Sequence, residues 1–180
     1  AATVLSNVGT YPITPAGGSD NNYTFSYVNG TLTITQATLT ATADNKSRAY
    51  GVANPPLTIS YSGFLNGDDA GDLDTPPTAT TAATVLSNVG TYPITPAGGS
   101  DNNYSFTYVN GTLTIPQATL TATADNKSRA YGVANPPLTI SYSGFLNGDD
   151  AGDLDTPPTA TTAATVLSNV GTYPITPAGG

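Results

Sequence analysis

The sequence predicts an all-β protein built from tandem small β-sandwich domains. Two observations predict this class. The 180-residue chain repeats itself with a period of 81 residues, and short runs in which Thr alternates with apolar residues recur between turns rich in Gly, Pro and Asn. Alternation with a period of two is typical of half-buried strands. Several short strands separated by turn signals are typical of a sandwich or a related small sheet fold.

The repeat determines how the rest of the chain is interpreted. Residues 1–81 realign on residues 82–162 with three differences, and residues 163–180 match residues 1–18 without change. The period is longer than the 20–50 residues of common solenoids, and it is long enough for a small domain with its own core. Near-identity of the copies indicates recent tandem duplication. The physics of one unit therefore describes the whole chain.

An Asn-Gly dipeptide predicts a β-hairpin over residues 104–115. Asn110–Gly111 favours a two-residue type I′ turn, in which both residues have positive φ. In the register that this turn sets, Tyr108 faces Leu113. Aromatic and aliphatic side chains then share one face of the hairpin, and Thr and Ser share the other. We expect this hairpin to close one unit.

The next alternating run begins at Ala118, directly after the predicted hairpin, so unit boundaries are expected near Gln36 and Gln117. The sequence thus predicts three pieces. They are the C-terminal part of a repeat unit at 1–35, a complete repeat unit at 36–116, and the N-terminal part of a following unit, lacking its closing hairpin, at 117–180.

Further alternating or β-compatible runs predict four more strands in the complete unit, at residues 38–43, 57–61, 78–85 and 90–95. In the first of these, Leu39, Ala41 and Ala43 share a face that we expect to be buried. Pro93 cannot donate a backbone hydrogen bond, so its strand is expected at an edge or with that side free. The segment Asp68–Leu73 is short and contains Gly, which allows at most one short helical turn per unit.

Composition excludes several classes of function. The chain has no Cys, His or Glu, which removes disulfides, zinc fingers, thiol nucleophiles and Ser-His-Asp triads. A net charge of -8 argues against nucleic acid as a partner, because phosphates require Lys and Arg. No apolar run approaches the roughly 20 residues that span a bilayer. The sequence therefore predicts neither an enzyme nor a membrane-inserted segment.

One acidic loop is the candidate for a metal site. Its Asp residues fall within seven positions and recur one period later: Asp68, Asp69, Asp72 and Asp74, then Asp149, Asp150, Asp153 and Asp155. An acidic loop that contains Gly supplies the oxygen ligands that calcium prefers. The spacing differs from that of an EF-hand, and no Glu is present as a bidentate ligand. A solvated acidic loop is the alternative, and no other cofactor is expected.

The few basic residues carry a separate expectation. Lys46 and Arg48 lie in a polar stretch beside a turn. We expect both side chains to be exposed and to pair with acids, each contact contributing about 0–1 kcal/mol.

Motifs in the repeat resemble the MBG repeat of the YGX type. The segments that resemble its opening are Lys46–Gly51, Asn54–Pro55 and Tyr61–Asp68, and those that resemble its close are Val89–Thr95, Asn103–Tyr104 and Tyr108–Ile115. The resemblance covers the whole chain in three pieces. Val52 departs from the pattern, since an acidic residue often follows the Tyr-Gly pair.

The resemblance implies an all-β domain, immunoglobulin-like or alternatively β-grasp-like, without catalytic residues. It also implies tandem arrays in bacterial surface and secreted adhesin-like proteins. The expected function is therefore a structural stalk or fibre segment at the cell surface, whose partners are neighbouring copies of the repeat. Two alternatives are a self-assembling filament, in which residues 19–35 complete residues 117–180 of another chain by strand addition, and a carbohydrate- or host-ligand-binding module using the repeated Tyr residues.

Overall fold

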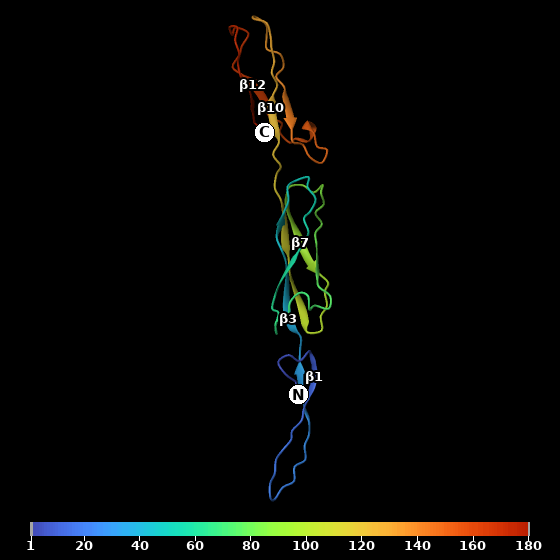
Figure 1. Cartoon of the computed structure of the whole chain (residues 1–180). Helices are drawn as coiled ribbons and strands as arrows, with labels where there is room; N and C mark the ends of the chain where they lie inside the picture. The colour runs from blue at the N-terminus through green and yellow to red at the C-terminus, as the bar shows by residue number, and fades with distance from the viewer. Residues whose placement is uncertain (1, 180) are drawn as a thin grey trace. The chain divides into compact units, whose positions relative to one another are not determined.

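The computed structural model describes residues 2–179 and is all-β (Figure 1). The chain divides into two compact units. The first consists of Ala1–Arg48, Asn54–Thr84 and Gly90–Ile115, and the second consists of Ala49–Ala53, Val85–Val89 and Pro116–Gly180. Among the described residues, no helix has the length and apolarity that crossing a membrane would require.

The described part of the first unit contains nine strands, several of them short. In chain order they are β1 (Gly9–Ile13), β2 (Gly30–Ile34), β3 (Ala37–Ala43), β4 (Lys46–Ser47), β5 (Ile59–Ser62), β6 (Thr78–Thr80), β7 (Gly90–Ala97), β8 (Tyr104–Val109) and β9 (Gly111–Ile115). β1 and β2 form an antiparallel pair of their own.

The other seven strands form two sheets. In one, β3 lies between β5, its antiparallel partner, and β8, its parallel partner. In the other, the order is β4-β9-β7-β6, and the pairing of β4 with β9 is parallel. β3 also lies close to β7 and β9 of the second sheet. Two sheets in contact agree with the sandwich class expected from the sequence.

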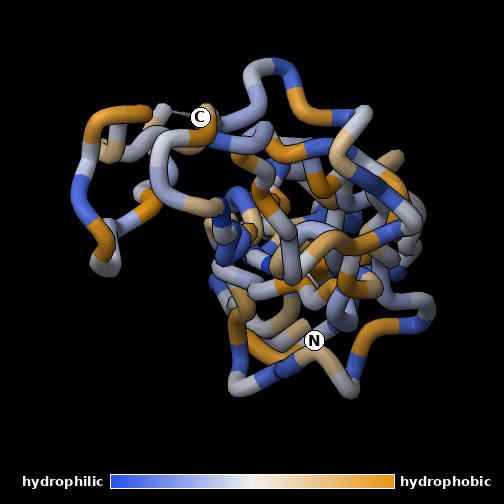
Figure 2. Tube along the Cα trace, turned by 90° about the horizontal axis from the view of Figure 1, so that it is seen from above, coloured by the Kyte–Doolittle hydropathy of each residue, from blue (hydrophilic) through white to orange (hydrophobic). Residues whose placement is uncertain are grey.

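Alternation along the strands places the core between the sheets. Leu39, Ala41 and Ala43 of β3 are buried, as their spacing predicts, and Leu113 and Ile115 of β9 are buried with them. The intervening Thr residues of β9 are exposed. Figure 2 shows the same feature as short stretches of hydrophobic and hydrophilic residues that succeed one another along the trace. β-branched Thr suits the wet face of such a strand.

The predicted hairpin over residues 104–115 is wrong. β8 and β9 lie in different sheets, so the chain passes from one sheet to the other at Asn110–Gly111. A Cβ added to Gly111 would lie 2.3 Å from the carbonyl oxygen of Ala43. Gly is therefore required here for close approach of two backbones, and Asn110 does not have the positive φ of a type I′ turn.

Pro93 lies where its missing N–H is tolerated. It pairs with Thr112 of β9, whereas β6 reaches only Thr95–Ala97 on the other side of β7. The opposite side of the strand at Pro93 therefore has no strand partner, as expected for proline in a sheet.

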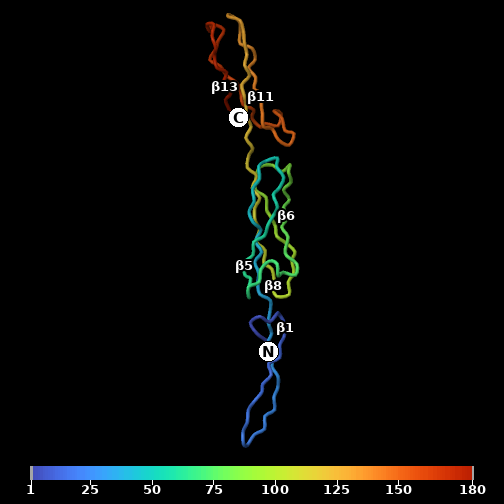
Figure 3. The backbone as a smooth tube through the Cα atoms, viewed as in Figure 1, coloured from blue at the N-terminus to red at the C-terminus, as the bar shows by residue number. Residues whose placement is uncertain are grey.

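The second unit repeats part of this plan. It contains β10 (Thr121–Ala124), β11 (Ile140–Ser143), β12 (Thr159–Thr162) and β13 (Ile175–Ala178), with the 3₁₀ turn η1 at Ala151–Asp153. β10 pairs with β11, and β12 pairs with β13, both antiparallel; β11 and β13 are labelled in Figure 3. The short turn η1 agrees with the expectation of at most one helical turn per unit.

Candidate functional site

A tyrosine and an aspartate connect the core of the first unit to its acidic loop. The hydroxyl of Tyr104 donates to Oδ2 of Asp68 at 2.7 Å and accepts from the backbone N–H of Leu65 at 2.9 Å. The ring packs edge-on against Phe64 at a centroid distance of 5.6 Å. Burial raises the pKa of the Tyr104 hydroxyl above its usual value. The side chain of Tyr104 is therefore part of the core. A sugar-binding groove would instead need a tyrosine ring that is exposed to solvent.

The other three Asp residues of the predicted calcium loop accept hydrogen bonds from backbone N–H groups, two of them within the loop. Asp69 accepts from the N–H of Gly71 at 2.6 Å, and Asp72 accepts from the N–H of Asp69 at 2.8 Å. Asp74 accepts from the N–H of Asn102 at 3.1 Å, and Asp101 accepts from that of Asp74 at 3.2 Å. Each of these carboxylates has a structural use without a metal.

The second copy of the loop behaves in the same way. Oδ1 of Asp150 accepts from the N–H of Gly152 at 2.7 Å, and Oδ2 of Asp153 accepts from the N–H of Asp150 at 2.8 Å, which forms a capping box on η1. Asp149 accepts from the hydroxyl of Tyr50 at 3.0 Å. Asp155 is exposed.

Across residues 2–179 the structure brings no three His, Cys, Asp or Glu side chains together in a group that could hold a metal ion. Seven of the eight Asp residues singled out by the sequence accept hydrogen bonds from backbone N–H groups or from a tyrosine hydroxyl, and Asp155 is exposed. A calcium site and a solvated acidic loop both stay predictions.

The expectation for Arg48 is wrong. Its side chain is only 6% exposed, and it donates through Nε to Oδ1 of Asn54 at 2.7 Å and through Nη2 to the carbonyl of Thr84. Asn54 in turn donates to the carbonyl of Ala83 at 2.6 Å. The guanidinium therefore donates to two neutral oxygens, one from Asn54 and one from Thr84, which is 36 residues away in sequence. Reasoning from neighbouring residues could not reveal these partners.

The expectation for Lys46 holds only in part: its side chain is half-buried where exposure was expected, and its charge acts on the carboxylate of Asp44. The hydroxyls of Ser60 and Thr58 donate to the Asp44 carboxylate, the first at 2.6 Å. These two bonds, with a smaller effect of Lys46, hold the pKa of Asp44 below its usual value. The carboxylate of Asp44, which directly follows β3, is therefore bonded both to Ser60 of β5 and to Thr58, just before β5.

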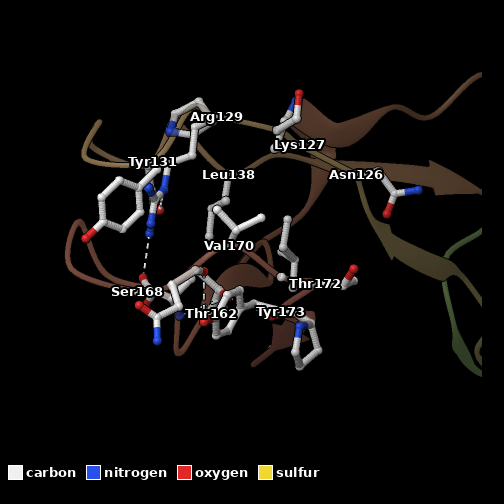
Figure 4. Close-up of a pocket in the computed structure, with 18 residues that line it drawn as sticks. Asn126, Lys127, Arg129, Tyr131, Leu138, Thr162, Ser168, Val170, Thr172 and Tyr173 are labelled. Carbon is white, nitrogen blue, oxygen red and sulfur yellow. Dashed lines mark hydrogen bonds between the residues drawn. The ribbon is translucent and has the colours of Figure 1, made fainter.

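A cavity of about 730 Å³ lies in the second unit. In Figure 4, Arg129 and Tyr131 lie on one side of it and Ser168 and Tyr173 on the other, with Val170 between them. Its lining includes residues 126–129 and 170–175, which are the copies of residues 45–48 and 89–94. In the first unit β9 lies between those two segments, paired with both. The cavity therefore corresponds to the position that β9 occupies in the complete unit.

Comparison with protein families gives one result. A family model described as MBG domain (YGX type) matches residues 1–33, 39–114 and 120–180. Comparison with curated proteins and with solved structures finds no match.

Proposed function

The chain belongs to the MBG domain (YGX type) family, and from this premise we propose that it is a stalk or fibre segment of an extracellular bacterial adhesin-like protein. Its function in this proposal is mechanical spacing. The family is one of repeats typical of extracellular surface proteins, and near-identical copies suit a spacer, whose output is length. The acidic, cysteine-free composition suits a secreted chain that must stay soluble.

The observation that carries this proposal is the parallel pairing of the first strand of the repeat with β8, the strand directly before its last strand β9. β3 opens the unit and pairs in parallel with β8 over six residues, Ala37–Thr42 with Tyr104–Val109. Tension applied at the two ends of the unit pulls parallel neighbours past each other, so their ladder bonds share the load. An antiparallel pair pulled at its open end would instead lose its bonds one at a time.

The connection between repeats supports the same function. Two residues, Thr35 and Gln36, separate β2 from β3. The side-chain amide of Gln36 donates to the carbonyl of Asp101 at 2.9 Å and lies 3.3 Å from that of Tyr104. A two-residue connection anchored in this way bends less than a Gly/Ser-rich linker. At the equivalent position of the next connection, Pro116 fixes φ.

Force spectroscopy on a tandem array of the repeat tests the proposal. Each 81-residue repeat should add roughly 27–29 nm of contour on unfolding before the folded length is subtracted. The force should fall when the unit is pulled instead through Thr38→Cys and Ser62→Cys, which unzips β3 from β5. Equal forces in the two directions would contradict a load-bearing role.

A second candidate, a filament joined by strand complementation, is favoured by one comparison. Leu32 of β2 is 45% exposed, whereas its copy Leu113 in β9 is 0% exposed. The cavity of the second unit corresponds to the position of β9, and residues 30–34 repeat the sequence of β9. Strand addition from another copy would fill it. Light scattering over a range of concentrations tests this, since a chain that stays monomeric throughout excludes it. Binding of a glycan or host ligand stays a prediction, which a glycan array can test.

A further inference from the structure

A loop with the sequence Ala-Tyr-Gly-Val-Ala, here called the Tyr-Gly loop, occurs at residues 49–53 and 130–134. Its first copy belongs to the second compact unit, together with residues 85–89 and 116–180. In that unit the hydroxyl of Tyr50 donates to Oδ2 of Asp149 at 3.0 Å, and Nδ2 of Asn147 donates to the carbonyl of Val85 at 3.4 Å. The Tyr-Gly loop thus contacts the turn Leu146–Asp149, here called the LNGD turn.

The two copies of the Tyr-Gly loop differ in what covers them. A Cβ added to Gly51 would lie 2.9 Å from Cβ of Leu146, whereas a Cβ added to Gly132 would have no atom within 4 Å. Tyr50 is half-buried, whereas Tyr131 is 67% exposed. Both glycines have a φ of 76°. The free loop already has the backbone conformation of the covered one, so docking requires little rearrangement there.

A complementary surface lies in the first unit. Its own LNGD turn, Leu65–Asp68, lines a cavity of about 400 Å³ together with Val4–Val8. Those five residues are the copies of Val85–Val89, which belong to the same compact unit as the covered loop. Asp68 already accepts from Tyr104, and a carboxylate oxygen has room for a second donor. The cavity is therefore shaped and charged for the hydroxyl of an incoming Tyr-Gly loop.

We propose that the Tyr-Gly loop is a docking surface for the LNGD turn of the repeat that follows it, held by a tyrosine hydroxyl on an aspartate. The occupant of the exposed Tyr131 loop is accordingly the LNGD turn of a further copy. The contact is small, so it is effective between tethered repeats, where the effective concentration is high. This inference deepens the proposed spacer function, on which it rests, by naming the surface that limits bending.

Spin labels test the contact because the chain has no cysteine. Labels on Thr107→Cys and Thr161→Cys, both exposed positions, report the distribution of distances between a strand of the first unit and one of the second. Tyr50→Phe and Asp149→Asn should each lower the equilibrium constant for docking roughly two- to tenfold, the size of one hydrogen bond, and broaden the distribution. The double variant should broaden it no further, because both changes remove the same bond.

Tyr131→Phe is the matched control. It makes the same change in an identical loop without the contact, and it should leave the distribution unchanged. A narrow distribution in Tyr50→Phe would overturn the proposal. If Tyr50→Phe unfolds its own repeat, as circular dichroism would show, Asp149→Asn decides the outcome from the other partner. A broad distribution in the parent chain itself, together with unfolding forces that depend on the pulling direction as proposed above, would refute the docking surface and leave the spacer function intact.

Discussion

Arg48 and Asn54 hold two loops of the first unit together. Nε of Arg48 donates to Oδ1 of Asn54 at 2.7 Å, and Nδ2 of Asn54 donates to the carbonyl of Ala83 at 2.6 Å. The charge of the guanidinium is thus stabilised by oriented amide and carbonyl dipoles. Equivalent bonds join Arg129 to Asn135 and Asn135 to Ala164 in the second unit.

Replacing Arg48 by Lys should destabilise the first unit. An ammonium cannot reproduce the planar fork that reaches Asn54 and Thr84 together. We expect the free energy of opening to fall by about 1–3 kcal/mol, measured by amide hydrogen exchange in β3. Arg129→Lys is the matched control with the same sequence neighbours. Its side chain is more exposed, so water can replace lost bonds and the loss in β10 should be smaller. Equal losses would show that burial is not the cause.

Tyr104→Phe should also destabilise the first unit. It removes the bond to Asp68 and leaves the N–H of Leu65 without its acceptor. The expected cost is about 1–3 kcal/mol, measured as a loss of exchange protection in β3 and β8. Tyr23→Phe changes the corresponding residue of the preceding repeat, which is exposed, and should have no measurable effect. A similar loss in both variants would contradict the role assigned to Tyr104.

Acid should weaken the link that Asp44 makes between β3 and β5. The pKa of Asp44 is lowered in the folded state, first by the hydroxyl of Ser60 and then by that of Thr58. Its contribution to stability is therefore fully present above the unfolded pKa of about 3.9, and it is lost as the pH falls through the lower folded value. The pKa of Asp125 is lowered in the same way by Ser141 and Thr139.

The measurement is the unfolding midpoint between pH 6 and pH 2, compared with that of Asp44→Asn/Asp125→Asn. The double variant should lose part of the acid dependence and should be less stable than the parent near neutral pH. An unchanged acid profile would show that other carboxylates dominate. Because both aspartates lie near the surface, we expect the effect to be modest and to decrease with added salt.

Calcium is the fourth test. The carboxylates of Asp69 and Asp72 already cap N–H groups of their own loop, so the loop is ordered without a cation. We therefore expect the unfolding temperature to be the same in millimolar calcium and in excess chelator. A rise with calcium that disappears in Asp69→Asn/Asp72→Asn would establish the site that the sequence suggested.

The sequence predicted features that depend on local periodicity. Alternation at Leu39, Ala41 and Ala43 identified a buried face correctly, because a period of two fixes which side chains share a side. It could not identify partners that are distant in sequence. Arg48 looks exposed among polar neighbours, but its guanidinium is buried and donates to the carbonyl of Thr84, 36 residues away. Strand partners were missed for the same reason.

The acidic loop shows a related limit. Four aspartates close together suit a cation, and they equally suit a loop that must cap its own N–H groups. The choice depends on where the backbone directs each amide. The partner of the Asp68 carboxylate is the hydroxyl of Tyr104, which lies 36 positions away in the sequence. The presence of both residues in the complete repeat is all that the sequence shows of this pairing.

Asn110–Gly111 and its copy Asn29–Gly30 allow the strand crossing itself to be tested. A Cβ on Gly111 would meet the carbonyl oxygen of Ala43 at 2.3 Å, whereas a Cβ on Gly30 would meet only Ile13 at 3.6 Å, an ordinary contact. Gly111→Ala should therefore force the sheets apart and cost about 1–3 kcal/mol, seen as lost protection in β9. Gly30→Ala should be neutral or slightly stabilising, since Ala restricts the unfolded chain. If both dipeptides instead formed type I′ hairpins, Ala would be strained at both positions and the two losses would be equal.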